Sequence, residues 1–473
     1  MANVKLTING KAVSVPAGTS ILDAAKEAGV RIPTLCAYEG MGPHASCKLC
    51  IVNIAGEEKE KLACAVKVAE GMVVTTDSPE LFEKRKVTVT EMFRQHAVDC
   101  HHCARIGGSH IEDIDPELCR NCFYCDCVRE GFCELQALAR EFGVSVLPFE
   151  PRTHDFPVDE STGVIIRDGN KCVKCRRCVD MCKAQGMGIL GMIKTENGTT
   201  VGAKNGMAAD GCIRCGRCVD VCPTGALSMR EHIDEIVYHA HEKHTTTAVM
   251  LCGCVMRELQ SLYGTDFSYE QLAASVRKFG VDHVYSPGWA RAESLRQAAD
   301  LLDARLGKGL MIMTESAAAE NFLRAKFPEL EKHFAFYDSM QTVFGKRLRA
   351  EHPDWKLINI SRHNGFAAEA ADNGLVDYFV NARELFRIVE RTGGAPYRRE
   401  PGEVEDVAPY EKETRYDELL NRDGWLLTGE AEEFTFKKPN GRKLYKAAVC
   451  HNLAQAEKIL ARAEEFDIIR VMG

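Results

Sequence analysis

Two short stretches, CVKCRRCVDMC at residues 172–182 and CIRCGRCVDVCP at residues 212–223, decide how the middle of this chain folds. Each has the spacing C-x2-C-x2-C-x3-C, and only the second continues with a proline. Three thiols so close in sequence suit a cuboidal [4Fe–4S] cluster better than the tetrahedral shell of zinc. The two stretches therefore predict a pair of [4Fe–4S] clusters.

This spacing resembles that of bacterial two-cluster ferredoxins, in which the fourth cysteine of each run ligates the other cluster. The resemblance implies crossed ligation, which requires the two halves of the segment to fold against each other. One cluster would take Cys172, Cys175, Cys178 and Cys222, and the other Cys182, Cys212, Cys215 and Cys218.

Cysteines are spread unevenly along the 473 residues. Of the 22, nineteen lie between Cys36 and Cys222, and only Cys252, Cys254 and Cys450 follow. The N-terminus has no signal-peptide pattern, so we expect a reducing cytoplasm, where dense CxxC spacing indicates metal ligation rather than disulfides. The length predicts two to four domains. The net charge of −8 argues against nucleic-acid binding, and no apolar run is long enough to predict a membrane helix.

A first ligand set follows the N-terminal elements. Residues 3–16 predict a hairpin turning at Asn9-Gly10, and a helix follows an N-cap at Thr19 or Ser20. The next cysteines predict a [2Fe–2S] cluster, with a four-cysteine zinc site as the alternative; they are Cys36, Cys47, Cys50 and Cys64. The order and spacing resemble the β-grasp ferredoxin domains of the large peripheral subunit of complex I and of [FeFe]-hydrogenases.

The stretch from His96 to Cys133 resembles the His-ligated [4Fe–4S] site of the same two families, including Glu134-Leu135-Gln136 after the last cysteine. It departs from them because 29 residues, instead of five, separate its third and fourth ligand positions. The candidate ligands are His96, Cys100, Cys103, Cys119, Cys122, Cys125, Cys127 and Cys133. These eight groups are enough for two [4Fe–4S] clusters, whose division of ligands stays open. The alternative is a single His-ligated cluster with spare or zinc-binding thiols.

Together these sets predict one [2Fe–2S] cluster and four [4Fe–4S] clusters, or three if residues 96–133 hold only one. A single reaction site has no need of so many clusters. A row of them indicates the transfer of single electrons, with each potential tuned by ligand type, hydrogen bonds to sulfur and burial.

From about Thr245 the pattern changes to alternating strands and helices, which predicts parallel sheets with crossover helices. Segments 339–350, 375–385 and 466–473 resemble parts of the catalytic domain of [FeFe]-hydrogenases. Cysteines of that family are missing: its first motif is replaced by TESAA (314–318) and its second by NIS (359–361), and its third would continue past Gly473. The resemblance thus implies a degenerate domain without the hydrogen-activating H-cluster, and we expect no catalytic site in this chain.

The later cysteines and the nucleotide motifs offer no replacement site. Cys252 and Cys254 are expected on one face of an apolar strand, and they and Cys450 are expected to be buried structural cysteines. No Gly-rich motif for flavin, NAD or ATP is present, so flavin and NAD(P) are expected on partner subunits. The acidic segment 401–434 is either a solvated insertion or a partner-docking segment.

We therefore expect a multidomain α+β and α/β protein with four parts. These are a [2Fe–2S] β-grasp ferredoxin domain (1–79), a His/Cys-ligated [4Fe–4S] domain with a Cys-rich insertion (80–150), a 2[4Fe–4S] ferredoxin domain (151–235) and a hydrogenase-like domain without the H-cluster (236–473).

The whole chain resembles the catalytic subunit of NADH-dependent, electron-bifurcating [FeFe]-hydrogenases with the hydrogen site lost, as in the Sporomusa-type bifurcating transhydrogenase. This implies an electron-transfer subunit of a cytoplasmic hetero-oligomer. Its partners would be flavoproteins that carry FMN or FAD and bind NAD(H) or NADP(H), together with ferredoxin. The alternatives are the electron-transfer subunit of an NAD(P)-dependent formate dehydrogenase, and a redox or hydrogen sensor that uses the degenerate domain.

Overall fold

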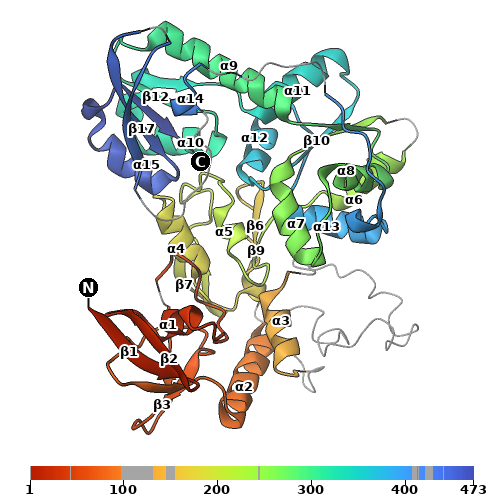
Figure 1. The fold of residues 1–473 in the computed structure, drawn as a ribbon. Helices are drawn as coiled ribbons and strands as arrows, with labels where there is room; N and C mark the ends of the chain where they lie inside the picture. The colour runs from red at the N-terminus through yellow and green to blue at the C-terminus, as the bar shows by residue number, and fades with distance from the viewer. Residues whose placement is uncertain are drawn as a thin grey trace.

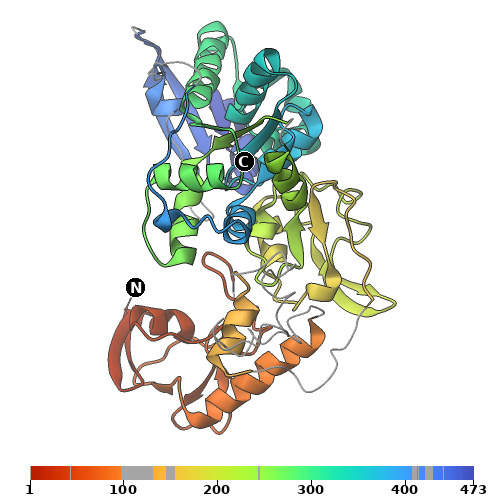
Figure 2. The ribbon, with the colours of Figure 1, turned by 90° about the vertical axis from the view of Figure 1, so that its right-hand side faces the viewer.

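The computed structural model describes residues 2–42, 44–96, 132–144, 155–242, 245–406, 413, 415–420, 430–439 and 441–472. Three bodies follow one another along its length (Figures 1 and 2). A small N-terminal sheet with its helices lies at one end, a ferredoxin-like segment lies in the middle, and two sheets with their helices form the other end. Within the described residues, no helix has both the length and the apolar character needed to cross a bilayer.

The N-terminal body is a mixed five-stranded sheet of order β2-β1-β5-β3-β4. The predicted hairpin is confirmed, since β1 and β2 pair antiparallel around Asn9 and Gly10, which both have positive φ. Ser20, rather than Thr19, caps the first helix by accepting a hydrogen bond from the backbone N–H of Asp23. The elements are β1 (Asn3–Ile8), β2 (Lys11–Pro16), α1 (Ile21–Glu27), β3 (Ile51–Ile54), β4 (Lys61–Leu62) and β5 (Val73–Thr75).

Two helices pack together beside the first cysteine loop: α2 (Pro79–Gln95) and α3 (Glu134–Glu141). Ser78 caps α2, and the Cys133 side chain caps α3. Phe93 and Leu135 share a buried core with Cys36 and Cys47. The two helices therefore flank the first ligand set. Two further predicted ligands lie at their ends: His96 directly follows α2, and Cys133 directly precedes α3.

The middle body contains two antiparallel pairs of short strands and a helix within each cysteine run. Its core consists of apolar side chains from both halves together with Cys178, Cys218 and Cys222. Its elements are β6 (Ile165–Arg167), η4 (Gly169–Lys171), α4 (Arg177–Ala184), β7 (Gly191–Thr195), β8 (Gly198–Gly202), α5 (Arg217–Asp220) and β9 (Leu227–Met229).

The C-terminal body contains two sheets, as the alternating pattern predicts. The first is parallel, with strand order β11-β10-β14-β15. Its strands are β10 (Thr247–Leu251), β11 (His283–Tyr285), β14 (Lys356–Ile360) and β15 (Tyr378–Val380). The helical elements of this part are α6 (Ile233–His241), η5 (Gly253–Val255), α7 (Met256–Tyr263), α8 (Tyr269–Lys278), α9 (Gly288–Arg305), α12 (Gly365–Asn373), α13 (Ala382–Arg391) and η7 (Pro396–Arg398).

The second sheet has the order β13-β12-β18-β17-β16 and is parallel except for its last pair. Its strands are β12 (Met311–Thr314), β13 (Phe334–Phe336), β16 (Glu432–Lys437), β17 (Leu444–Cys450) and β18 (Ile468–Val471). The helical elements that pack here are α10 (Ala317–Lys326), η6 (Pro328–His333), α14 (Asp417–Leu420), α15 (Leu453–Leu460) and η8 (Ala463–Glu465), joined by the C-terminal half of α9. Helix α11 (Met340–Glu351) follows β13 in the chain but packs on the first sheet, where Phe344 shares a core with Met250 of β10.

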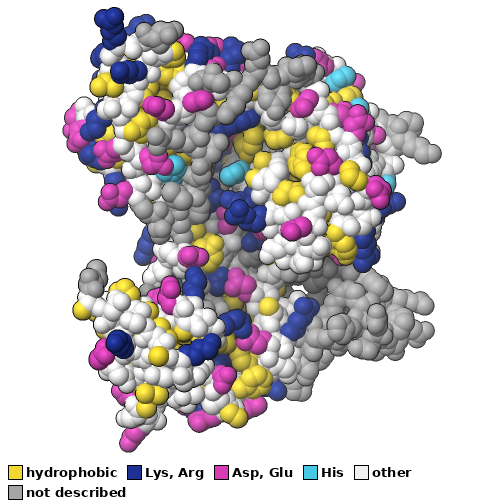
Figure 3. Space-filling view, viewed as in Figure 1, with side chains coloured by type: hydrophobic (Ala, Val, Ile, Leu, Met, Phe, Trp, Pro, Cys, Tyr) yellow, Lys and Arg dark blue, Asp and Glu magenta, His cyan; other side chains and the backbone are white. Residues whose placement is uncertain are grey.

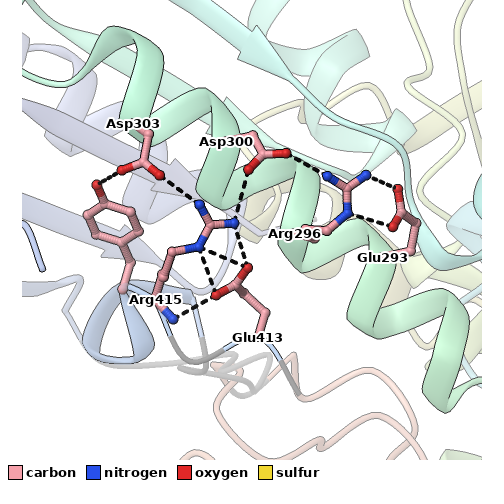
Figure 4. Close-up of polar contacts among 7 residues, drawn as sticks. Glu293, Arg296, Asp300, Asp303, Glu413 and Arg415 are labelled. Carbon is pink, nitrogen blue, oxygen red and sulfur yellow. Dashed lines mark hydrogen bonds and ion pairs between the residues drawn. The ribbon is translucent and has the colours of Figure 1, made fainter. Parts of the chain in front are cut away.

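Acidic and basic side chains are mixed over the visible face of the C-terminal body (Figure 3), and described parts of the acidic segment 401–434 pack on this body. Arg415 pairs with Asp300 and Asp303 of α9, and the Tyr416 hydroxyl donates to Asp303 over 2.6 Å (Figure 4). Leu419 of α14 is fully buried in the core beneath the second sheet. An ion-pair network and a buried apolar pair, Leu419 and Leu420, hold these described residues on the body, so the first of the two alternatives, a solvated insertion, does not describe them.

Candidate iron–sulfur sites

The four cysteines of the first set come together in the loops around β3. Cys36 lies close enough to Cys47, and Cys50 to Cys64, for each pair to influence its partner's pKa. All four are buried, and the backbone N–H of Leu35 donates to the sulfur of Cys47 over 3.5 Å. Cys64 also lines an open groove of about 480 Å³ beside α1. This donor set fits a small iron–sulfur cluster close to the protein surface.

The ferredoxin-like segment has two cavities, each lined by three cysteines of one run and the last cysteine of the other. One set surrounds the first cavity: Cys172, Cys175, Cys178 and Cys222. The other set surrounds the second cavity: Cys182, Cys212, Cys215 and Cys218. The structure therefore gathers the cysteines in the grouping that crossed ligation requires.

The two cysteine loops have the same backbone conformation. Lys174 and Arg176 in the first run have φ of 56° and 68°, and Arg214 and Gly216 at the matching positions of the second have 59° and 71°. The left-handed region costs a residue with a Cβ about 1–2 kcal/mol. Three such residues in two short loops show that the cysteine positions, rather than backbone preference, determine the loop shape.

Burial makes the cysteine sets unfavourable as free thiolates. It raises the pKa of Cys175 and of Cys215 to about 12, and it raises those of Cys178 and Cys218 well above the usual range. Thiolates gathered at such positions need a compensating positive charge, which ferrous and ferric ions supply when thiolates ligate them.

One hydrogen bond fixes the tautomer of His96. Its Nδ1 lies 2.9 Å from the carbonyl oxygen of Lys171, and because a carbonyl oxygen only accepts, Nδ1 carries the proton; in a metal site the ligating atom would be Nε2. Lys171 directly precedes Cys172, and its carbonyl also accepts from the Thr224 hydroxyl over 2.8 Å. The histidine is thus joined to the backbone of the first ferredoxin set.

Cys133 lies beside the same set. The backbone N–H of Glu134 donates to the carbonyl of Pro223, which follows Cys222. The other predicted ligands of this stretch lie outside the described residues; they are Cys100, Cys103, Cys119, Cys122, Cys125 and Cys127.

Polar contacts connect the first cysteine set to the ferredoxin-like body. The Ser46 hydroxyl donates to the carbonyl of Cys175 over 3.5 Å, and His44 lies 2.7 Å from Asp180 of α4. Arg177 of α4, with a side chain only 5% exposed, forms a bidentate pair with Glu134 at 2.7 and 2.8 Å. No sequence pattern signals this pair, because its partners lie 43 residues apart in unrelated motifs.

The second ferredoxin set packs against the C-terminal body. An added Cβ on Gly216 would lie 2.3 Å from the Cβ of Asn364, and Asn364 donates to Asp220 over 2.7 Å. Arg214 forms a bidentate pair with Asp372 of α12 at 2.9 and 2.6 Å. This cysteine set therefore faces the loop that leads from β14 into α12.

The residues at the resembled hydrogenase motifs have ordinary structural roles here. Ser316 caps α10 by accepting from the N–H of Ala319, and Ala317 begins that helix. Ser361, in the second motif, is fully buried after β14 and lies 3.6 Å from the sulfur of Cys254.

The remaining cysteines differ from one another. Cys450 is fully buried in β17, as predicted. The expectation for Cys252 and Cys254 is wrong, because β10 ends at Leu251 and both cysteines lie half-buried in the turn that follows. Gly253 between them was the sequence signal for this strand end.

Sequence comparison assigns families to three parts of the chain. Residues 1–79 match the 2Fe-2S iron-sulfur cluster binding domain, residues 171–226 match the 4Fe-4S dicluster domain, and residues 246–472 match the C-terminal domain of the iron only hydrogenase large subunit. The predicted fold class is confirmed, as is the order of these three parts.

One relative decides the family. The NADP-reducing hydrogenase subunit HndD of Solidesulfovibrio fructosivorans is 30% identical over 428 residues, which are 83% of this chain and 69% of that protein. The chain belongs to the family of iron–sulfur subunits of NAD(P)-reducing hydrogenases.

The other proteins that this iron–sulfur subunit resembles match a smaller share of this chain or of their own length. An NADH-quinone oxidoreductase subunit of Rhizobium meliloti is 30% identical over 72% of this chain and 39% of that protein. The gamma subunit of the NAD-reducing hydrogenase HoxS of Cupriavidus necator is 30% identical over 39% of this chain and 68% of its own length. Among solved structures, the similarity to an NAD+-reducing [NiFe]-hydrogenase covers 48% of this chain and 87% of the matched chain, at 26% identity and a TM-score of 0.37.

Proposed function

We propose that this iron–sulfur subunit conducts single electrons between flavoprotein partners of a bifurcating complex, from a [2Fe–2S] cluster at one end to a [4Fe–4S] cluster against the C-terminal body. The observation that carries the proposal is the succession of gathered donor sets, each in contact with the next. The clusters, when bound, supply the one-electron chemistry, and the chain holds, spaces and shields them.

Three contacts define the route. Ser46 connects the first set to Cys175, and His96 connects its own site to Lys171 beside Cys172. Both routes converge on the set that includes Cys172 and Cys222. From there the route continues through α4 and α5, which pack together, to the second set beside Asn364. We propose His96, Cys133 and the six cysteines outside the described residues as the eight ligands of the two remaining [4Fe–4S] clusters.

The proposal divides the chain at residues 79, 150 and 235, and assigns no H-cluster to the last part. Ser316, Ala317 and Ser361 stand where the resembled hydrogenases have cysteine, and neither a hydroxyl nor a methyl group replaces an iron-binding thiolate. Electrons that reach the second ferredoxin set therefore pass to another subunit or to another group of this chain.

The partners follow from the chemistry. A chain of one-electron carriers needs a flavin wherever it exchanges electron pairs with NAD(H) or NADP(H). We place that flavin on partner subunits, with ferredoxin as the low-potential partner, because no flavin or dinucleotide fingerprint is present in the sequence.

Native mass spectrometry of the untagged complex from its own host tests the proposal. We expect flavin-containing subunits to accompany the chain, and the purified complex to reduce NADP+ with electrons from NADH and reduced ferredoxin without evolving hydrogen. A monomeric, flavin-free chain would overturn the subunit assignment. Hydrogen uptake with methyl viologen that tracks the amount of this chain would overturn the assignment of no H-cluster.

A further inference from the structure

Cys252 and Cys254 lie at the point of the first sheet where a ligand site is expected. The chain leaves β10 for β11 on one side of the sheet, while β14 and β15 lie on the other side. In an open parallel sheet, the loops leaving two such neighbouring strands diverge and form a crevice at the carboxyl ends. The turn Cys252–Cys254 follows β10, and Ser361–Asn364 follows β14, so both lie at the carboxyl ends of these two neighbouring strands.

The two sulfurs form a small polar cluster with Ser361. The sulfur of Cys254 lies 3.6 Å from the Ser361 hydroxyl, and Cys252 is near enough to both for their side chains to influence one another's pKa. The backbone N–H of Arg362 donates to the sulfur of Cys254 over 3.3 Å. Gly253 between them is exposed, and both cysteines are partly accessible. The hydrogen bond with Cys252 lowers the pKa of Cys254 to about 6 and raises that of Cys252. The backbone N–H of Arg362 and the Ser361 hydroxyl are both placed to stabilise a thiolate on Cys254, so we take Cys254 as the nucleophile of the pair and Cys252 as the thiol beside it.

The polar group formed by Cys252, Cys254 and Ser361 is close to the proposed end of the electron route. Arg362, which donates to Cys254, is two residues from Asn364, and Asn364 lies against Gly216 next to Cys215. Two residues of chain span at most about 7 Å. The dithiol and the second ferredoxin set are thus separated by one short segment of backbone.

We propose that Cys252 and Cys254 are a redox-active dithiol–disulfide pair whose substrates are disulfides, and that the cysteine set at Cys215 lies next to it as the electron source. The assignment of the Cys215 set as the electron source depends on the proposed electron-transfer function, whereas the thiol–disulfide chemistry of Cys252 and Cys254 does not.

The chemistry balances in two steps. The Cys254 thiolate attacks one sulfur of a substrate disulfide and releases one substrate thiol; Cys252 then loses its proton, attacks Cys254 and releases the second. The pair ends as a disulfide and the substrate as two thiols. Two electrons, delivered singly, and two protons restore the dithiol.

Peptide mapping tests the thiol chemistry, because trypsin cleavage after Lys243 and Arg257 yields one peptide with both cysteines and no other. The intact, cluster-loaded protein is treated anaerobically with oxidised glutathione, then alkylated and digested. We expect peptide 244–257 to lose the mass of two hydrogens and to resist alkylation. Cys252→Ser should retain one glutathionyl group on Cys254, and Cys254→Ser should react at least tenfold more slowly. The buried Cys450, on peptide 447–458, is the internal control and should not react.

Reduction tests the electron source. After oxidation, viologen photoreduced without added thiol should return peptide 244–257 to the dithiol in cluster-loaded protein, and at least tenfold more slowly in protein stripped of iron. The assignment of a redox-active dithiol would be overturned if both thiols stayed unmodified after glutathione treatment, or if Cys252→Ser and Cys254→Ser reacted at equal rates. Equal reduction rates with and without iron would overturn the electron source while leaving the proposed function intact, because iron content and partner subunits are measured separately.

Discussion

Cys254 has the surroundings of a reactive cysteine. The groups that face it are Cys252, Ser361, the backbone N–H and charge of Arg362, and Tyr269 of α8. Because the pKa of Cys254 is lowered to about 6, its thiolate predominates at pH 7, whereas an ordinary thiol there is mostly protonated. We expect the rate of iodoacetamide modification to rise about tenfold between pH 5 and 7 and then to level off.

The measurement follows peptide 244–257 by mass spectrometry across this pH range. Ser361→Ala, which removes one hydrogen bond to the thiolate, should move the plateau to higher pH. A rate that still rises between pH 8 and 9, as for an unperturbed thiol, would contradict the assignment.

Glu384 provides a separate pH-dependent term in stability. It is buried at the start of α13, where it accepts from the backbone N–H of Asn381 in a capping box. Burial, with Glu231 adding repulsion, raises the pKa of Glu384 to about 8. Because the folded protein favours the protonated form of Glu384, this group contributes its full stability at a pH below its pKa in the unfolded chain, near 4.5. That contribution is lost as the pH rises through about 8.

We therefore expect Glu384→Gln, which keeps the cap but cannot ionise, to match the parent protein at pH 5 and to be about 1–3 kcal/mol more stable at pH 8.5. Scanning calorimetry of the loaded protein at both pH values measures this as a rise in melting temperature. Glu384→Ala is the control, since it loses the cap and should be less stable at pH 5. An equal effect of Glu384→Gln at both pH values would refute the linkage.

At the scale of elements, the contact between the second cysteine loop and α12 depends on one glycine. Gly216 has a φ of 71°, and an added Cβ would overlap Asn364 at 2.3 Å. Gly211 has a similar φ of 84°, but nothing lies within 4 Å of its would-be Cβ. Gly216→Ala and Gly211→Ala thus share the free-energy cost of placing alanine at a positive φ. They differ only in the overlap of the new Cβ with Asn364, which occurs at position 216 alone.

We expect Gly216→Ala to lose about four iron atoms per chain, the content of one [4Fe–4S] cluster, while Gly211→Ala keeps its iron. Adding Asn364→Gly to Gly216→Ala should restore the iron, because it removes the overlapping atom. Iron analysis after anaerobic purification decides the matter, and equal losses in both alanine variants would attribute the effect to backbone strain.

For the whole molecule, the order of the parts could be predicted because cluster ligation restricts cysteine spacing and alternating apolar runs restrict the C-terminal fold. The crossed grouping of Cys182 and Cys222 followed from the ferredoxin resemblance. The contacts between bodies could not be predicted, because they depend on single side-chain pairs such as Arg177 with Glu134, which no periodic pattern encodes. The end of β10 could not be placed because the apolar run continues past it, and a single glycine, Gly253, is a weak signal against such a run.

The number of clusters is the property of the whole molecule that tests the electron route most directly. One [2Fe–2S] and four [4Fe–4S] clusters contain about 18 iron and 18 sulfide per chain. We expect these values from iron and acid-labile sulfide analysis of anaerobically purified protein. About 14 would mean that residues 96–133 hold a single cluster and that their extra cysteines have another role. In either case the route from Cys64 through Cys175 to Cys215 is retained. Iron well above 18 would contradict the assignment of no H-cluster, because the predicted ligand sets would then not account for all of the iron.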